Sequence, residues 1–112
     1  MATERVLEGL RVVEIGQYVA APLTATILAD LGAEVTKVER PGGDPLRADP
    51  ARFAAWNRGK RSVELDLSTE AGRGELLALV DQADLLVENL RPGALARLGV
   101  GLDEMKRRRA RL

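Results

Sequence analysis

Arginine side chains follow several short apolar runs of this sequence, at the places where β-strands are expected to end. Arg40 comes after the run at residues 34–38, and Arg91 comes after the run at residues 84–88. Arginine binds phosphate through paired hydrogen bonds, and parallel strands bring their carboxyl ends to one edge of a sheet. The sequence therefore predicts an anionic ligand across that edge. Further arginines near expected strand ends are Arg47, Arg58, Arg61 and Arg97.

The composition excludes several kinds of active site. The chain contains no His and no Cys, so it has no Ser-His dyad, no imidazole base and no His- or Cys-ligated metal site of its own. We therefore expect no metal. The carboxylates that remain near expected strand ends each have a structural interpretation as loop, strand-end or cap residues. These are Asp44, Asp66, Asp84 and Glu88.

The elements that would position these residues follow from the spacing of apolar side chains. Apolar runs predict strands at residues 10–15, 34–38 and 84–88, and a period-two alternation predicts an edge or half-exposed strand at 62–67. A helix is predicted from Pro22 to Leu31, with Gly32 ending it. A loop is predicted at 41–50 and a helical turn at 52–56. Further helices are predicted from Ser68 or Thr69 to Gln82, at 94–98, and from a cap at Asp103 to Leu112.

The repeated order strand, helix, strand predicts an α/β fold with an open, mainly parallel sheet. A chain of 112 residues, 46% of them hydrophobic, is long enough for one domain with one core. The first expected loop, GQYVAA at residues 16–21, has one of the three glycines that a dinucleotide fingerprint requires. Tyr18 would also obstruct the approach of a pyrophosphate. We therefore expect no NAD.

Charge is unevenly distributed although the formal net charge is zero. Residues 1–90 hold 10 Lys and Arg against 15 Asp and Glu, whereas residues 91–112 hold 7 against 2. The basic run at 106–111 is interpreted as a solvated helix face, with a nucleic-acid-binding arm as the alternative. No aromatic stacking residues accompany the run, so we expect no nucleic-acid partner. No apolar run approaches the roughly 20 residues of a membrane span, and no signal peptide is recognisable, so we expect a cytoplasmic protein.

Short blocks with a fixed order extend over nearly the whole chain. They are LRVVEIG (10–16), AP (21–22), LADLGAEV (28–35), KVERP (37–41), GDPLR (43–47), NRGKRS (57–62), LDL (65–67), AD (83–84) and ENLRPG (88–93). In order and spacing these blocks resemble the amino-terminal part of the class III CoA-transferase family, or CaiB/BaiF family. That family includes formyl-CoA transferase, carnitine CoA-transferase and 2-methylacyl-CoA racemase. The resemblance runs from about Leu7 to Met105.

The resemblance implies a Rossmann-like large domain with helices on both faces that binds CoA rather than NAD. Residues 1–112 would be the amino-terminal part of that domain, with the sheet incomplete at the carboxyl end. Ser68 stands where formyl-CoA transferase has a Lys, and Val19 stands where that enzyme has a Gln. Carried over by position, the CoA-binding residues are Gln17, Tyr18, Ala20, Arg40, Leu65, Ser68, Asn89, Leu90 and Arg97.

The physical properties of these residues agree with a CoA site. Arg40 and Arg97 can bind the negative charges at the nucleotide end of CoA. The small side chains of Ala20 and Ala21 leave room for the pantetheine arm, and the amino end of the following helix adds partial positive charge. Glu39, by contrast, is interpreted as a structural acid at the end of its strand.

The resemblance also implies an enzyme that moves CoA between an acyl-CoA and a carboxylic acid, with an Asp as nucleophile on the thioester. Racemases of the family instead move a proton next to the thioester carbonyl. In the family both sets of catalytic residues lie beyond the position of Leu112, so we expect no catalytic residue in this chain. We also expect the chain to be a truncated piece of a longer enzyme and to be inactive alone. The family forms interlocked homodimers, so a homodimer is expected. A non-catalytic CoA-binding module and an interaction protein that uses its basic tail are the rival hypotheses.

Overall fold

Strands and helices alternate along the chain, as the sequence predicts. The structure, a computed structural model, describes residues 4–112. In chain order the elements are β1 (Arg11–Ile15), α1 (Ala20–Asp30), β2 (Glu34–Glu39), the 3-10 helix η1 (Pro45–Ala48), α2 (Pro50–Asn57), β3 (Arg61–Glu64), α3 (Glu70–Val80), β4 (Leu85–Glu88), α4 (Ala94–Arg97) and α5 (Leu102–Arg108).

The four strands form one parallel sheet in the order β3-β2-β1-β4. Val12 of β1 lies beside Val35 of β2 on one side and beside Leu85 of β4 on the other. The strand order therefore reverses between β1 and β4, because the chain builds outward from β1 in one direction and then returns to its other side. Open α/β sheets bind ligands at such a reversal, outside the carboxyl ends of the strands.

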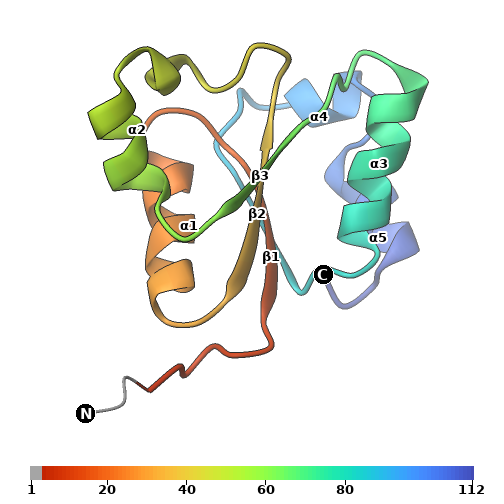
Figure 1. Cartoon of the computed structure of the whole chain (residues 1–112). Coiled ribbons are helices and arrows are strands. Elements are labelled where there is room, and N and C mark those ends of the chain that lie inside the picture. The colour runs from red at the N-terminus through yellow and green to blue at the C-terminus, as the bar shows by residue number, and fades with distance from the viewer. Residues whose placement is uncertain (1–3) are drawn as a thin grey trace.

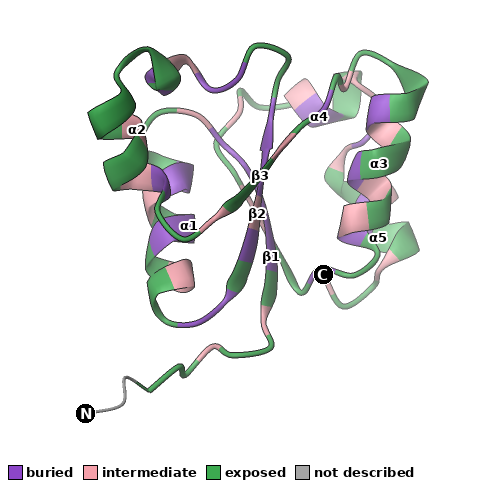
Figure 2. Ribbon diagram, viewed as in Figure 1, coloured by how far each residue is buried: buried purple, intermediate pink, exposed green. Residues whose placement is uncertain are grey.

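Helices cover both faces of the sheet, which confirms the predicted fold class. Helices α1 and α2 lie on one face, and α3, α4 and α5 lie on the other (Figure 1). Successive strand side chains point to opposite faces, so Val13 packs in the core toward α3 and Val12 packs in the core toward α1. Buried residues accordingly follow the strands and the inner sides of the helices (Figure 2). The core toward α3 is the larger; its buried members are Val13, Ile15, Val38, Leu65, Leu76, Val80, Ala83, Leu95, Val100 and Met105.

Two predicted helix ends are confirmed by their geometry. Gly32 follows α1 with a φ of 108°, in the left-handed region that a helix stop requires. Thr69 caps α3, because its Oγ1 accepts a hydrogen bond from the Gly72 N–H at 3.0 Å. Helix α1 begins at Ala20 rather than at Pro22, which lies inside the first turn, where a missing N–H still costs nothing.

Two predicted boundaries were wrong because a polar side chain makes a turn of its own. Strand β3 ends at Glu64 rather than at residue 67, since the Asp66 side chain accepts a hydrogen bond from the Ser68 N–H and starts a turn. The predicted loop at 41–50 contains η1, whose first turn the Asp44 side chain caps through the Leu46 N–H.

The last predicted helix is shorter than the sequence indicates. Helix α5 begins at Leu102 and ends at Arg108, with Gly101 rather than Asp103 as its N-cap residue. The prediction that this helix runs to Leu112 was therefore wrong. Leu112 lies in a turn after the helix, where its N–H donates to the Arg109 carbonyl at 3.1 Å, and its partly buried side chain packs against the core toward α3. Burial of this apolar side chain favours the turn.

Two arginines of the basic run after residue 105 bond to other parts of the chain, so the run is only partly a solvated helix face. The Arg108 guanidinium bonds to both carboxylate oxygens of Asp81, at 3.0 and 2.6 Å. Arg109 leaves the helical conformation and bonds to the Ala83 carbonyl and to the Asp84 carboxylate. These contacts fix α5 against the turn between α3 and β4. Within residues 4–112, no helix combines the length and the apolar character needed to cross a membrane.

Candidate ligand-binding site

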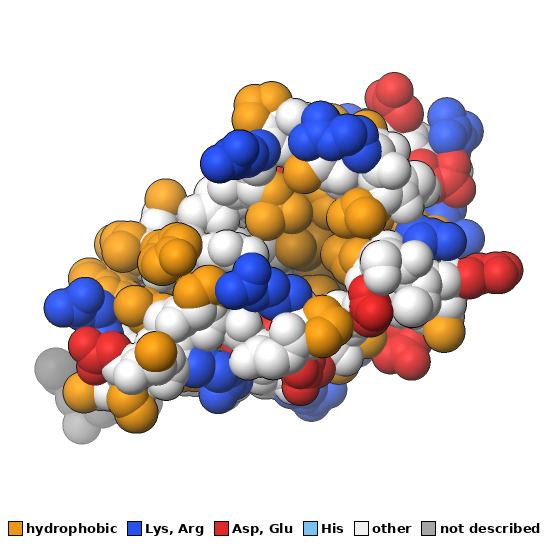
Figure 3. All heavy atoms as spheres, turned by 90° about the horizontal axis from the view of Figure 1, so that it is seen from above, with side chains coloured by type: hydrophobic (Ala, Val, Ile, Leu, Met, Phe, Trp, Pro, Cys, Tyr) orange, Lys and Arg blue, Asp and Glu red, His pale blue; other side chains and the backbone are white. Residues whose placement is uncertain are grey.

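A cavity of about 200 Å³ opens at the carboxyl edge of the sheet. Apolar side chains from the strand ends and from the turn after β4 form its floor, and polar side chains stand among them. Figure 3 views this end of the molecule and shows a hollow with hydrophobic side chains inside and Lys or Arg side chains around it. A hollow of this composition suits a ligand with an apolar arm and an anionic end. The lining residues are Ile15, Gly16, Gln17, Val38, Glu39, Arg40, Pro41, Asp44, Leu65, Asp66, Leu67, Leu90 and Leu98.

Four of the nine predicted site residues line this cavity together. Gln17 comes from the loop after β1, Arg40 from the end of β2, Leu65 from the end of β3 and Leu90 from the turn after β4. These residues are far apart in sequence, and the parallel sheet brings them to one edge. The structure therefore places part of the predicted set in a single site.

The other five predicted residues lie outside the cavity lining. Tyr18 is 55% exposed and has a φ of 63°, an uncommon conformation for a bulky side chain. Ala20 is the exposed first residue of α1, and Arg97 is exposed on α4. Ser68 donates a hydrogen bond to the Asp66 carboxylate at 2.6 Å, which helps to lower the pKa of Asp66. Asn89 is bonded to the backbone of Gln17.

Arg40 is exposed at the rim of the cavity, with much of its guanidinium uncommitted. The hydrogen bond recorded for its side chain among residues 4–112 runs from Nε to the Gly43 carbonyl at 3.4 Å. Its two terminal nitrogens therefore face no competing acceptor in the described part of the chain. A guanidinium held through Nε alone is well suited to present those nitrogens to a phosphate.

Glu39 is a structural acid, as the sequence indicates. Its carboxylate accepts two hydrogen bonds from Arg47, at 2.7 and 2.6 Å, one from the Asp44 N–H at 2.7 Å, and one from Ser62. Burial alone would raise the pKa of Glu39, but the hydrogen bonds from Arg47, Asp44 and Ser62 outweigh burial and lower the pKa to about 2. Glu39 thereby ties the turn after β2 to β3 and fixes one wall of the cavity.

A group of buried charges lies directly beneath the first loop, and sequence reasoning missed it. We call Glu14, Lys37, Asp44 and Lys60 the buried charge cluster; each side chain is at most 2% exposed. Lys37 Nζ lies 3.0 Å from both Glu14 Oε2 and Asp44 Oδ2, and Lys60 Nζ lies 2.6 Å from Glu14 Oε1. Burial lowers the pKa of Lys60, and the hydrogen bond to Glu14 opposes that shift. Charged residues inside the two central strands were the signal in the sequence, because such positions are otherwise apolar.

Arg91 does not line the same cavity as Arg40, and binding of one ligand by both across the edge stays a prediction. Arg91 lines a separate cavity of about 450 Å³ beside β4, together with Leu95 and Leu112. Leu90, the preceding residue, points to the Arg40 side instead. One residue along an extended turn is enough to move a side chain to the opposite side.

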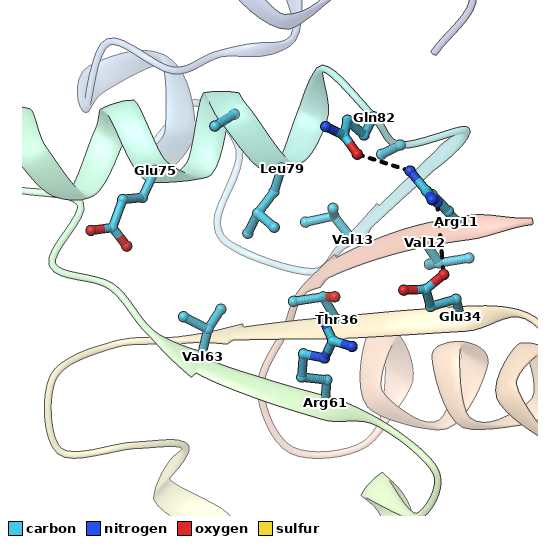
Figure 4. Close-up of a pocket in the computed structure, with 12 residues that line it drawn as sticks. Arg11, Val12, Val13, Glu34, Thr36, Arg61, Val63, Glu75, Leu79 and Gln82 are labelled. Atoms are coloured by element: carbon cyan, nitrogen blue, oxygen red, sulfur yellow. Dashed lines mark hydrogen bonds and ion pairs between the residues drawn. The ribbon is translucent and has the colours of Figure 1, made fainter.

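A larger cavity, of about 530 Å³, lies between α3 and the beginnings of β1, β2 and β3 (Figure 4). Val63 and Leu79 point into it, and Arg11 at its end bonds to Gln82 at 2.8 Å and pairs with Glu34 at 3.7 Å. It contains none of the nine predicted residues and lies at the amino ends of the strands. Of the two arginines that line it, Arg11 is already paired with Glu34. Because none of the nine predicted residues reaches this cavity, we take the smaller cavity at the carboxyl edge as the candidate ligand site.

The family model and the curated relatives point to the same family. Residues 7–112 match the model of the family described as CoA-transferase family III. The probable fatty acyl-CoA transferase Rv3272 of Mycobacterium tuberculosis is 44% identical over 95% of this chain and 29% of its own length. The succinyl-CoA:mesaconate CoA-transferase of Haloarcula hispanica is 41% identical over 89% of this chain and 28% of its own length.

The fold agrees with the same group of proteins. A crystal structure of Rv3272 superposes with a TM-score of 0.90 at 45% identity, over 95% of this chain and 31% of that one. The chain therefore spans less than a third of the length of the relatives that it matches.

Proposed function

The chain belongs to CoA-transferase family III, and from that membership we propose that it forms the CoA-binding portion of an enzyme that moves CoA between an acyl-CoA and a carboxylic acid. Residues 1–112 would be the amino-terminal part of the large domain of that enzyme. The names of the relatives support transfer of CoA as the reaction class. They differ in the acyl group, so the acyl group of this enzyme is left open.

One observation carries the proposal: Gln17, Arg40, Leu65 and Leu90 line one cavity at the point where the strand order reverses. The apolar floor suits the pantetheine arm, and Arg40 suits a phosphate of the nucleotide end. A cavity of about 200 Å³ accommodates only a segment of CoA. Among the remaining predicted residues, Tyr18, Ala20, Ser68 and Arg97 would meet CoA outside the cavity.

We place the nucleophile of the transfer reaction beyond Leu112, in a part of the enzyme that this chain does not contain. The carboxylates near the cavity are already committed to structural partners: Glu39 to Arg47, Asp44 to Lys37 and the Leu46 N–H, and Glu64 to the Gly42 N–H. Glu88 and Asp66 likewise accept bonds from backbone N–H groups. A nucleophilic carboxylate must be free to attack a thioester carbonyl. We therefore expect no acyl transfer by this chain alone.

Calorimetric titration of the folded chain with CoA, and separately with pantetheine, tests the proposal. Arg40→Ala should weaken CoA binding about tenfold or more, because a hydrogen bond to a charged group contributes roughly 1.5–3 kcal/mol. Pantetheine lacks the nucleotide phosphates, so its binding should not change. Arg52→Ala is the matched control, since Arg52 is an exposed arginine on α2 paired with Asp49. A folded chain that binds no CoA at millimolar concentration would contradict the proposal.

We also propose that the enzyme is a homodimer. Exposed apolar side chains on α1 and just after it support this, with Ile27 49% and Leu31 41% exposed. Sedimentation equilibrium measures the oligomeric state directly. The expected cytoplasmic location and the independence from metal ions and NAD stay predictions. Cell fractionation tests the location, and unchanged CoA binding in EDTA tests the independence from metal.

A further inference from the structure

Side chains of β1, of β2 and of the turn after β4 hold the backbone of Gly16 and Gln17, the two residues that follow β1. The Gly16 N–H donates to Glu14 Oε2 at 3.0 Å, and Lys37 Nζ donates to the Gly16 carbonyl at 3.2 Å. The Gln17 N–H donates to Asn89 Oδ1 at 3.0 Å, and Asn89 Nδ2 donates to the Gln17 carbonyl at 3.0 Å. All four backbone polar groups of this dipeptide are therefore satisfied by side chains.

The two side chains that bond to the Gly16 backbone, Glu14 and Lys37, belong to the buried charge cluster. Glu14 and Lys37 are at most 1% exposed and bond to each other at 3.0 Å. Lys60 extends the cluster to the start of α1 through the Pro22 carbonyl at 2.7 Å and to the end of α2 through Asn57 Oδ1 at 2.8 Å. Buried charges with this many partners have little freedom to move, because each lost bond leaves a charge unpaired.

The packing around Gly16 leaves no room for a side chain at that position. A Cβ atom built on Gly16 would lie 2.4 Å from the Ala21 Cβ and 3.0 Å from Asn89 Oδ1. Tyr18 comes next, with its φ of 63°. A bulky residue keeps such a conformation only where its surroundings determine it firmly. The fixed dipeptide before it provides that constraint.

We propose that Glu14, Lys37 and Asn89 form a clamp that presets the Gly16–Tyr18 backbone as a wall of the CoA site, so that Asn89 acts on the ligand through Gln17 and not by direct contact. Asn89 is then a positioning residue, because it follows β4 and holds the loop that follows β1. This inference rests on the proposed function and changes one expectation from the sequence, in which Asn89 touches CoA itself. A preset wall lowers the ordering cost of binding.

Asn89→Ala tests the clamp, because Asn89 is exposed and outside both cores, so the fold should survive its truncation. Hydrogen exchange is measured in the free protein, where CoA plays no part. The Gln17 amide should exchange at least tenfold faster, since Asn89 is its acceptor. The Gly16 amide, whose acceptor is Glu14, should be unchanged and serves as the internal reference. Arg91→Ala, two residues further along the same turn, should leave the Gln17 amide unaltered.

CoA affinity of the same variant completes the test. Loss of two hydrogen bonds that order the wall should weaken CoA binding about tenfold. Weaker binding with unchanged Gln17 exchange would show direct contact and overturn the clamp. Faster exchange with unchanged affinity would show that the clamp does not serve binding, which also overturns the inference. Absence of CoA binding by the unaltered chain would overturn the proposed function itself and the clamp with it.

Discussion

Two glycines of α3 offer a sharp test of the geometry beside the site. Gly72 and Gly74 lie two residues apart in the same helix, and alanine is the better helix former by roughly 1 kcal/mol at an unhindered position. A Cβ on Gly74 would meet nothing within 4 Å. A Cβ on Gly72 would lie 1.9 Å from the Asp66 carbonyl oxygen and 2.6 Å from the Asp66 carbonyl carbon. Both contacts are with backbone, which cannot rotate away.

Gly74→Ala should therefore stabilise the chain by about 1 kcal/mol, and Gly72→Ala should destabilise it by about 2–4 kcal/mol. The second figure combines overpacking, which costs about 1–3 kcal/mol, with strain on the Thr69 cap, which contributes about 1 kcal/mol. Urea denaturation followed by circular dichroism measures both free energies of unfolding. Gly72→Ala should also weaken CoA binding, because the displaced turn carries Asp66 and Leu67 of the cavity. If Gly72→Ala is as stable as Gly74→Ala, the turn does not pack on α3 as described.

Two further predictions concern the charges that support the site. Glu39 has a pKa of about 2 in the folded chain, below its ordinary value of 4.5. The ionised carboxylate therefore adds to the free energy of unfolding above about pH 4.5, and this contribution is lost as pH falls toward 2. The loss should reach about 2 kcal/mol after allowance for solvent around the half-exposed Arg47. Glu39→Gln should flatten the stability profile between pH 4.5 and 2. An equally steep profile in the variant would show that Glu39 is not the group that titrates there. Lys60→Met removes a partner of buried Glu14 and should cost about 3–5 kcal/mol in urea unfolding, whereas Lys106→Met, at an exposed position of α5, should change little. Equal effects of the two lysine variants would show that Lys60 is not buried in a charge cluster.

The sequence predicted the architecture because the relevant signals are local. Val-rich runs and Gly32 are sufficient to place strands and one helix end, and their alternation implies a parallel sheet. Boundaries failed where a polar side chain made a turn of its own. Asp66 ends β3 early and Asp44 starts η1, through hydrogen bonds that depend on the local backbone path rather than on a periodic pattern. The last helix stops short of Leu112 for a different reason, because Arg109 and Leu112 find partners in the turn before β4 and in the core, which no local pattern reveals.

The site was only partly predictable, because the roles of its polar residues depend on contacts between distant segments. Arg40 could be proposed from its place after a strand, and the structure puts it at the cavity. Asn89 looked like a ligand contact, and only the pairing of β1 with β4 reveals its bonds to Gln17, 72 residues away. Glu14 and Lys37 sit in apolar runs and drew no functional interpretation, although a charge inside a central strand must find a buried partner.

The location of bound CoA is the most direct test of the central claim that the carboxyl edge of this sheet is a CoA site. Titration of the isotope-labelled chain with CoA, followed through backbone amide chemical shifts, maps that location residue by residue. If the carboxyl edge is the CoA site, the largest shifts occur at Gln17, Arg40, Leu65 and Leu90, around one cavity. Shifts that instead gather at Glu34, Glu75 and Gln82, around the larger cavity at the amino edge, would contradict this claim.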